Sequence, residues 1–237
     1  MSDTAAPQAP AKLRPALPRL SGSARDRLGR VPAVAFFGVC TVAYAHAVVT
    51  KLPGIGGMDA AGVLELLARI AALAFVLLVT LAMAVRLPPV ARQGGVAPRL
   101  VALGGAFSLL ALPLVAARVE MPLGMAALSL GLLIAGHAFS CYALLHLGRA
   151  LSIMAEARRL VTTGPYGVVR HPLYAAEAVA SAGILLQFWS APAVALWVVH
   201  IGLQAGRMLY EEGLLRRTFP EYEGYARRTA RLIPGVF

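Results

Sequence analysis

The residues most able to do chemistry gather in the stretch Thr162–Tyr174, which reads TTGPYGVVRHPLY. It brings Tyr166, Arg170, His171 and Tyr174 close together in a chain that is otherwise mostly apolar. Phenol, guanidinium and imidazole groups hydrogen-bond to charged or polar ligands. We therefore predict that this stretch forms part of a binding site for a charged ligand.

The local sequence also predicts how these side chains are presented. The Gly164–Pro165 pair is typical of a turn, and Pro172 suits the first position of a helix, where its missing N–H costs nothing. On that helix His171, Tyr174 and Glu177 follow one another at intervals of three residues, so they lie on neighbouring parts of one face. Alternatively, these side chains are only anchors at the membrane interface.

A second polar feature, the adjacent pair Glu211 and Glu212, closes the last apolar segment. Carboxylates suit a ligand that carries positive charge, especially where water is scarce. We expect the pair to lie at the same membrane depth as His171. The alternative is a solvated helix end whose carboxylates pair with Arg216 or Arg217.

The composition indicates a membrane protein. Of 237 residues 59% are hydrophobic and 14% charged, and the mean hydropathy is +0.71. We predict an all-α, polytopic transmembrane helix bundle with about six membrane segments, the last two forming a helical hairpin, and a cytoplasmic cofactor pocket. The predicted segments are 31–50, 62–86, 99–118, 122–147, 173–190 and 192–210. The fifth is short and carries Glu177, so a complete crossing is left open.

The basic residues predict the orientation in the membrane. In the six-segment topology all of them fall on one side except Lys51, Arg69 and Arg118. Such an asymmetry places both termini in the cytoplasm, and we expect a bacterial inner membrane. The net charge of +11 is thereby explained without nucleic acid. We divide the chain into a disordered basic tail (1–30), N-terminal transmembrane helices (31–120) and a functional core (121–237).

Two other classes of function remain open, a redox protein and a non-catalytic membrane protein. His46, His137 and His200 lie on three different apolar segments and could build a haem-linked or quinone-linked redox site, but they lack helical spacing within any one segment. We predict no metal site. A non-catalytic transporter or scaffold is the other alternative.

Taken together, the motifs of the C-terminal part resemble the isoprenylcysteine carboxyl methyltransferase and phospholipid methyltransferase superfamily of integral membrane enzymes. The resemblance covers about 140–237, and the first three segments show no matching motif. It is carried by the following pieces: Gly164-Pro165-Tyr166, Arg170-His171-Pro172-Leu173-Tyr174, Glu211-Glu212, Phe219-Pro-Glu-Tyr222-Glu-Gly-Tyr225 and Arg231-Leu-Ile-Pro234-Gly.

The resemblance implies S-adenosylmethionine as the methyl donor. It assigns nine residues to the cofactor pocket, namely Gly164, Pro165, Tyr166, Arg170, His171, Pro172, Tyr174, Glu211 and Glu212. One carboxylate of the acidic pair would hold the cofactor's amino group. Arg228 lies near the place of an arginine that can address a substrate carboxylate, so Arg228 and Glu177 are the catalytic candidates.

The predicted acceptor is lipophilic or membrane-embedded, either a small molecule or a lipid-anchored group, and it would enter sideways from the membrane lipids. A carboxylate acceptor is favoured, because it is ionised at neutral pH and needs no general base. A phospholipid amine or a small thiol would have to lose a proton, for which His171 or Glu177 is available. The sequence leaves these alternatives open, and it does not predict the oligomeric state.

Overall fold

A computed structural model of the protein describes residues 22–235. Residues 1–21, most of the predicted disordered tail, lie outside the described residues. The rest of that prediction is wrong, because helix α1 (Gly22–Val49) already includes residues 22–30. Arg30 explains the earlier start: its Nη1 and Nη2 donate to the carbonyls of Ala84 and Arg86, both at 2.9 Å, and so cap the end of the next helix.

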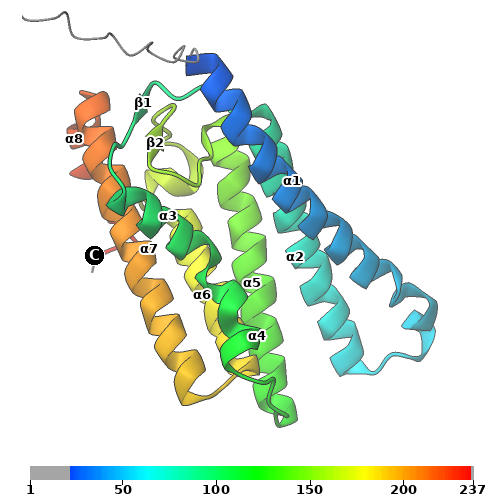
Figure 1. The fold of residues 1–237 in the computed structure, drawn as a ribbon. Helices are drawn as coiled ribbons and strands as arrows, with labels where there is room; N and C mark the ends of the chain where they lie inside the picture. The colour runs from blue at the N-terminus through cyan, green and yellow to red at the C-terminus, as the bar shows by residue number, and fades with distance from the viewer. Residues whose placement is uncertain (1–21, 236–237) are drawn as a thin grey trace, which may run out of the picture.

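The described chain is mainly helical (Figure 1). After α1 the larger elements are α2 (Ala60–Val85), α3 (Ala97–Phe107), α4 (Leu112–Val115), α5 (Leu123–Leu147), α6 (Pro172–Gln187), α7 (Ala191–Thr218) and α8 (Tyr222–Ala226). A 3₁₀ segment, Ser108–Ala111, joins α3 to α4, and another covers Gly164–Gly167. Two short antiparallel strands, β1 (Ala91–Arg92) and β2 (Glu156–Ala157), pair with each other.

The protein is an integral membrane protein built as an all-α helix bundle. Within residues 22–235, five stretches are long and apolar enough to cross a membrane: Leu28–Gly57, Ala60–Val85, Ala97–Val115, Leu123–Ala150 and Ala191–Thr218. The six predicted segments all contain helix. The fifth, α6, has 16 residues and spans about 24 Å, which is less than a hydrocarbon layer of ~30 Å. The sixth, α7, extends to Thr218, beyond the predicted end at residue 210.

The helices form two groups that face each other. In the first, α1 packs on α2, α2 on α5, and α5 on α6, while in the second α3 packs along α7. The turn at 188–190 makes α6 and α7 the predicted hairpin, with Ser190 as the N-cap of α7. The connections 86–96 and 148–171 and the C-terminal part 219–235 gather at one end of the bundle, which we call the loop end (Figure 1).

The tightest helix contact lies between α5 and α6, at Gly136. A Cβ atom at this position would lie 2.5 Å from the backbone nitrogen of Ala180 and 2.8 Å from its Cα. The two backbones are therefore too close for any side chain at this position. Nearby, the buried Ser129 hydroxyl donates to the Gly183 carbonyl at 2.8 Å. These contacts fix α6, which carries much of the site described below.

We predict that Gly136→Ala lowers the free energy of unfolding by about 1–3 kcal/mol, because the new methyl group would push against the Ala180 backbone. The measurement is thermal unfolding of the detergent-solubilised protein. Gly131→Ala on the same helix is the matched control, since a Cβ there meets nothing within 4 Å. Equal loss of stability in both variants would contradict this account of the α5–α6 contact.

Candidate active site

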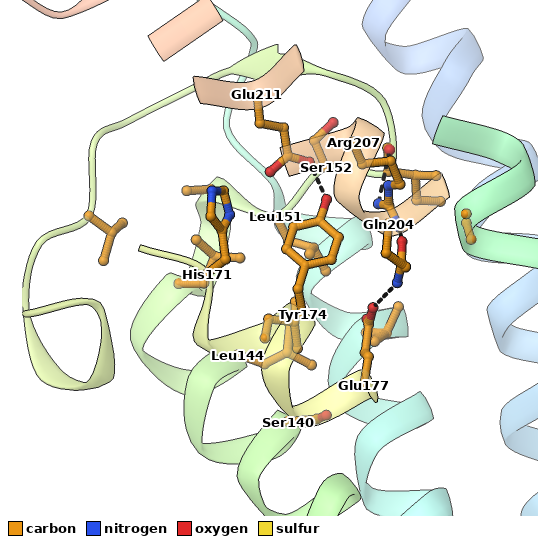
Figure 2. A pocket seen from close by; sticks show the side chains of 18 of the residues that line it. Ser140, Leu144, Leu151, Ser152, His171, Tyr174, Glu177, Gln204, Arg207 and Glu211 are labelled. Atoms are coloured by element: carbon orange, nitrogen blue, oxygen red, sulfur yellow. Dashed lines mark hydrogen bonds between the residues drawn. The ribbon is translucent and has the colours of Figure 1, made fainter. Parts of the chain in front are cut away.

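A cavity of about 330 Å³ lies between the two groups of helices below the loop end. Its lining combines two kinds of side chain. Polar ones come from the connections, α6 and α7, among them His171, Tyr174 and Glu211 (Figure 2). Apolar ones come from α1, α2, α5 and the segment formed by α3 and its 3₁₀ continuation, including Phe37, Phe75, Val79, Ala106, Leu109 and Leu144. A ligand with one polar and one apolar part fits this mixed lining.

The predicted turn at Gly164–Pro165 is confirmed and has a steric cause. Gly164 adopts a φ of +61°, and a Cβ there would lie 2.1 Å from the ring of His146, so both conformation and space require glycine. The turn directs Tyr166 into the cavity wall. Tyr225 fixes it there by donating from its hydroxyl to the Tyr166 carbonyl at 2.7 Å. Burial raises the pKa of the Tyr225 phenol to about 12, so it stays a neutral donor at physiological pH.

The predicted polar face of α6 is also confirmed. The helix begins at Pro172, and His171, Tyr174 and Glu177 all line the cavity. The rings of His171 and Tyr174 meet edge to face, with their centroids 5.4 Å apart. One helical face thus presents an imidazole, a phenol and a carboxylate at successive depths (Figure 2).

Glu212 is the centre of a buried ion cluster. Its side chain is 1% exposed, and its Oε1 lies 3.0 Å from Arg170 Nε, 3.2 Å from His171 Nε2 and 2.9 Å from Arg231 Nε. Arg231 Nη2 and Arg216 Nη2 approach the other oxygen at 3.1 and 3.8 Å. The carboxylate therefore ties α7 to the start of α6 and to the C-terminal segment, and its oxygens are already occupied.

Arg170 extends this cluster to the C-terminal segment. Its Nη1 donates to the carbonyls of Ala226 and Thr229, both at 2.6 Å, and its backbone N–H donates to the Ala230 carbonyl at 2.8 Å. The segment after α8 is thereby held against the loop that carries the RHP motif. Arg170 lines the cavity, but its guanidinium serves this structural network.

Glu211, the other half of the acidic pair, is placed differently. It lines the cavity, and its Oε1 accepts a hydrogen bond from the Tyr174 hydroxyl at 2.5 Å. No cation of the described residues lies within 4.0 Å of this carboxylate. Because α7 continues to Thr218, both glutamates lie inside a helix and not at its end, contrary to the predicted boundary. Of the pair, Glu211 is the one available to a cationic ligand.

A polar chain that the sequence analysis missed runs along α7. Gln204 Nε2 donates to Glu177 Oε2, and Arg207 Nη1 donates to Gln204 Oε1, both at 2.8 Å (Figure 2). The Arg207 guanidinium also lies over the Tyr174 ring, 5.0 Å from its centroid. The signal was present in the sequence: Arg207 lies one turn before Glu211 within an apolar helix, and ionisable residues in membrane helices often mark functional sites.

Arg207 is a buried cation that makes no direct ion pair with a described residue. It is 9% exposed, and no carboxylate of the described residues lies within 4.0 Å of its guanidinium nitrogens. Nη2 donates to the Ile153 carbonyl at 3.2 Å, whereas the buried Nε has no hydrogen-bond partner. A buried charge is costly unless it is paired. Arg207 therefore has the properties of a binding group for an anion.

Several predicted residues do not reach the cavity. Gly164 and Pro165 line a separate apolar groove on the outer surface, beside Phe139. Pro172 begins α6 but is not part of the cavity lining, and Glu212 is not part of it either. Arg228 is exposed just beyond α8, so the structure does not bring this catalytic candidate to the other site residues.

The three scattered histidines have separate local partners or positions. His200 Nδ1 lies 3.0 Å from the Ser108 hydroxyl, and His137 Nδ1 donates to the Leu133 carbonyl at 2.8 Å. Both line the cavity, whereas His46 lies in the last turn of α1 and does not. Among residues 22–235, no group of three or more His, Cys, Asp or Glu side chains is arranged to hold a metal ion.

Comparison with known proteins agrees with this geometry. Residues 119–222 match the sequence model of the phospholipid methyltransferase family. The fold is that of a polytopic membrane protein, and the family that matches part of it is a methyltransferase family. The match is consistent with the predicted resemblance to the isoprenylcysteine and phospholipid methyltransferase superfamily.

Two curated relatives align over shorter stretches. The nickel-cobalt-cadmium resistance protein NccN of Alcaligenes xylosoxydans xylosoxydans is 38% identical over 80 residues, which cover 33% of this chain and 38% of that protein. The cobalt-zinc-cadmium resistance protein CzcN of Cupriavidus metallidurans is 34% identical over 76 residues, covering 32% and 35%. The chain thus spans little more than a third of the length of the curated relatives it matches.

We predict that Glu212→Gln destabilises the protein by roughly 1–3 kcal/mol, because the partly buried guanidinium groups of Arg170 and Arg231 lose charge-assisted hydrogen bonds to their shared counter-ion. Glu211→Gln is the matched control and should cost much less, since its partner is a single neutral hydroxyl. Thermal unfolding in detergent measures both. A Glu212→Gln variant as stable as Glu211→Gln would refute the structural role assigned to this cluster.

Proposed function

We propose that the protein transfers a methyl group from S-adenosylmethionine to a carboxylate of a lipophilic acceptor, at the loop end of the bundle. The observation that carries the carboxylate assignment is Arg207. Its buried guanidinium lines the cavity, and no carboxylate of the described residues lies within 4.0 Å of it. An acceptor with an anionic group and an apolar chain matches both parts of the lining.

The residues of the polar half fit S-adenosylmethionine. The cofactor carries positive charge on its sulfonium and amino groups, and no cation of the described residues lies within 4.0 Å of the Glu211 carboxylate. Tyr166, Tyr174 and Tyr222 also line this half, and aromatic faces attract cations. The buried Tyr222 hydroxyl has no hydrogen-bond partner and could serve a polar group of the ligand.

The residues of the cavity would act by positioning the acceptor next to the methyl donor and by excluding water from both. When bound, the cofactor supplies an electrophilic methyl group for an in-line displacement, and an ionised carboxylate can attack it without a general base. Arg207 would orient that carboxylate, with Gln204 holding the guanidinium and Tyr174 supporting it from below. The enclosing apolar side chains would keep water from competing with the acceptor.

A second candidate acceptor is an amine, because Glu177 also lies in the cavity. Its Oε2 accepts from Gln204, and its Oε1 makes no hydrogen bond to a described residue. A carboxylate could hold a lipid ammonium group or take its proton. The names of the two relatives refer to metal resistance and to no methyl acceptor, so they do not favour either choice.

The proposed location is a bacterial inner membrane, with both termini and the loop end in the cytoplasm. Basic residues of the loop end support this orientation, including Arg92, Arg149, Arg159, Arg217 and Arg227. The soluble cofactor would then arrive from the cytoplasm and the acceptor from the adjoining leaflet.

We expect S-adenosylmethionine to bind the detergent-solubilised protein in isothermal titration. Glu211→Gln should weaken binding about tenfold or more, because a charge-assisted hydrogen bond is lost, and His171→Ala should weaken it as well. Arg227→Ala, at an exposed position away from the cavity, is the control and should bind normally. Absence of any binding by the unaltered protein would rule out the proposed methyl transfer.

Membranes incubated with methyl-labelled S-adenosylmethionine test the acceptor. A carboxylate acceptor yields base-labile label, an amine gives base-stable lipid label, and a small thiol gives volatile label. We expect base-labile label that falls about a hundredfold in Arg207→Gln, because the acceptor anion loses its buried partner, and partial activity in Arg207→Lys. Base-stable label that depends on Glu177 would instead establish the amine.

A further inference from the structure

We propose that the apolar chain of the acceptor reaches the cavity laterally through a seam between α1 and α3, which is closed by Phe36, Phe37 and Phe107. We call these three residues the aromatic seam. The inference rests on the proposed function in one respect, namely that the acceptor is lipophilic. It adds the place of access and the part of the chain that controls it.

The aromatic seam lies between the cavity and the outer surface of the bundle. Phe36 and Phe107 meet edge to face with centroids 5.2 Å apart, and Phe37 lies 6.4 Å from Phe107. Phe37 lines the cavity, whereas Phe36 is 38% exposed. Ala106 and Leu109, next to Phe107 in the chain, line the cavity as well. Movement of these rings would therefore widen a path between the cavity and the bilayer.

The opposite side of the cavity is closed more firmly. There α6 and α7 are joined by the Gln204–Glu177 hydrogen bond at 2.8 Å and by one from Trp197 Nε1 to the Ser181 hydroxyl at 3.0 Å. A packed cluster around Leu185 seals the far end of the same two helices. Separating α6 from α7 would break buried hydrogen bonds in a region without water, which is costly. Parting the aromatic rings breaks none.

Beside the aromatic seam, the α-helix changes to a 3₁₀ helix. The α-helical part of α3 ends at Phe107, whose φ and ψ are −124° and −5°, and the chain continues as the 3₁₀ segment Ser108–Ala111. A 3₁₀ stretch in the middle of a helix often marks a hinge. Below this change, Ser108 is bound to His200 on α7, which keeps the lower part of the segment in place while Phe107 turns.

The position of the aromatic seam selects the leaflet next to the loop end. Arg30 is fixed at the end of α2, and Phe37 follows it by two helical turns, about 10 Å deeper along α1. That depth lies within one leaflet of a ~30 Å hydrocarbon layer. A single acyl or isoprenoid chain whose head group stays at the loop end would meet the rings directly, and its head group would face Arg207.

Both helices of the aromatic seam lie outside residues 119–222, the part that matches the methyltransferase family. The family domain supplies the polar site, and the N-terminal helices supply the passage. We therefore infer that selection among acceptor chains resides in α1 and α3 of this protein, independently of the residues that bind the methyl donor.

Labelling of a cavity thiol tests the passage without requiring catalysis. Val79 is buried and lines the cavity, so Val79→Cys is made in a Cys40→Ala, Cys141→Ala background and reconstituted in vesicles. N-hexadecylmaleimide is supplied in the bilayer, and a small water-soluble maleimide in the medium. We expect Phe107→Ala to accelerate labelling by the lipid reagent about two- to tenfold, because an aromatic contact is lost, and Phe36→Trp to slow it.

The control for a general effect of deleting an aromatic ring is Phe139→Ala, since Phe139 is also 38% exposed but lies on the outer face of α5, away from this cavity. It should leave both labelling rates unchanged. Equal acceleration with both reagents in Phe107→Ala, or no change at all, would overturn the proposed passage. Because labelling needs no S-adenosylmethionine, a positive result stands even if no methylated product is found, and a negative one leaves the methyl transfer intact.

Discussion

The buried carboxylate of Glu212 is the constraint on which the rest of the site depends. It sits within one helix and receives cationic groups from the RHP loop and from the C-terminal segment. Ion pairs in water contribute little to the free energy of folding. A buried charge such as that of Glu212 is costly unless it is paired, so loss of its partners is expected to destabilise the protein. The cluster therefore determines where α6 begins relative to α7, and so where His171 and Tyr174 point.

This arrangement places the two members of the acidic pair in different surroundings, Glu212 in the ion cluster and Glu211 at the cavity. Adjacent residues of a helix point about 100° apart, so Glu212 faces the bundle cluster while Glu211 faces the cavity. The same helix brings Arg207 to the cavity one turn deeper. One continuous helix thus holds the carboxylate of Glu211 and the guanidinium of Arg207 one turn apart. The spacing of their backbones is fixed by the helix, which a flexible loop would not achieve.

Much of the site was predictable because it is local. The turn at Gly164, the helix start at Pro172 and the face formed by His171, Tyr174 and Glu177 follow from spacing and backbone chemistry. The different surroundings of Glu211 and Glu212 could not be predicted from the sequence. Which of two neighbouring carboxylates joins the ion cluster depends on partners that are distant in the chain, such as Arg231. Arg207 was not predicted as a site residue, because its part in the site depends on contacts with Gln204 and Tyr174 in the folded protein. The contact of Arg30 with the end of α2, near the start of α1, is one that composition cannot reveal.

A packed cluster closes the end of the bundle opposite the loop end. Leu112, Leu185 and Phe188 are buried there against one another, and they close the space below the cavity between α4, α6 and α7. The cavity therefore has no continuation between these helices toward the far end of the bundle. Under the proposed function, a lipid acceptor would enter and leave on the same side, so it would be modified without being translocated and the chemical difference would stay confined to one face of the membrane.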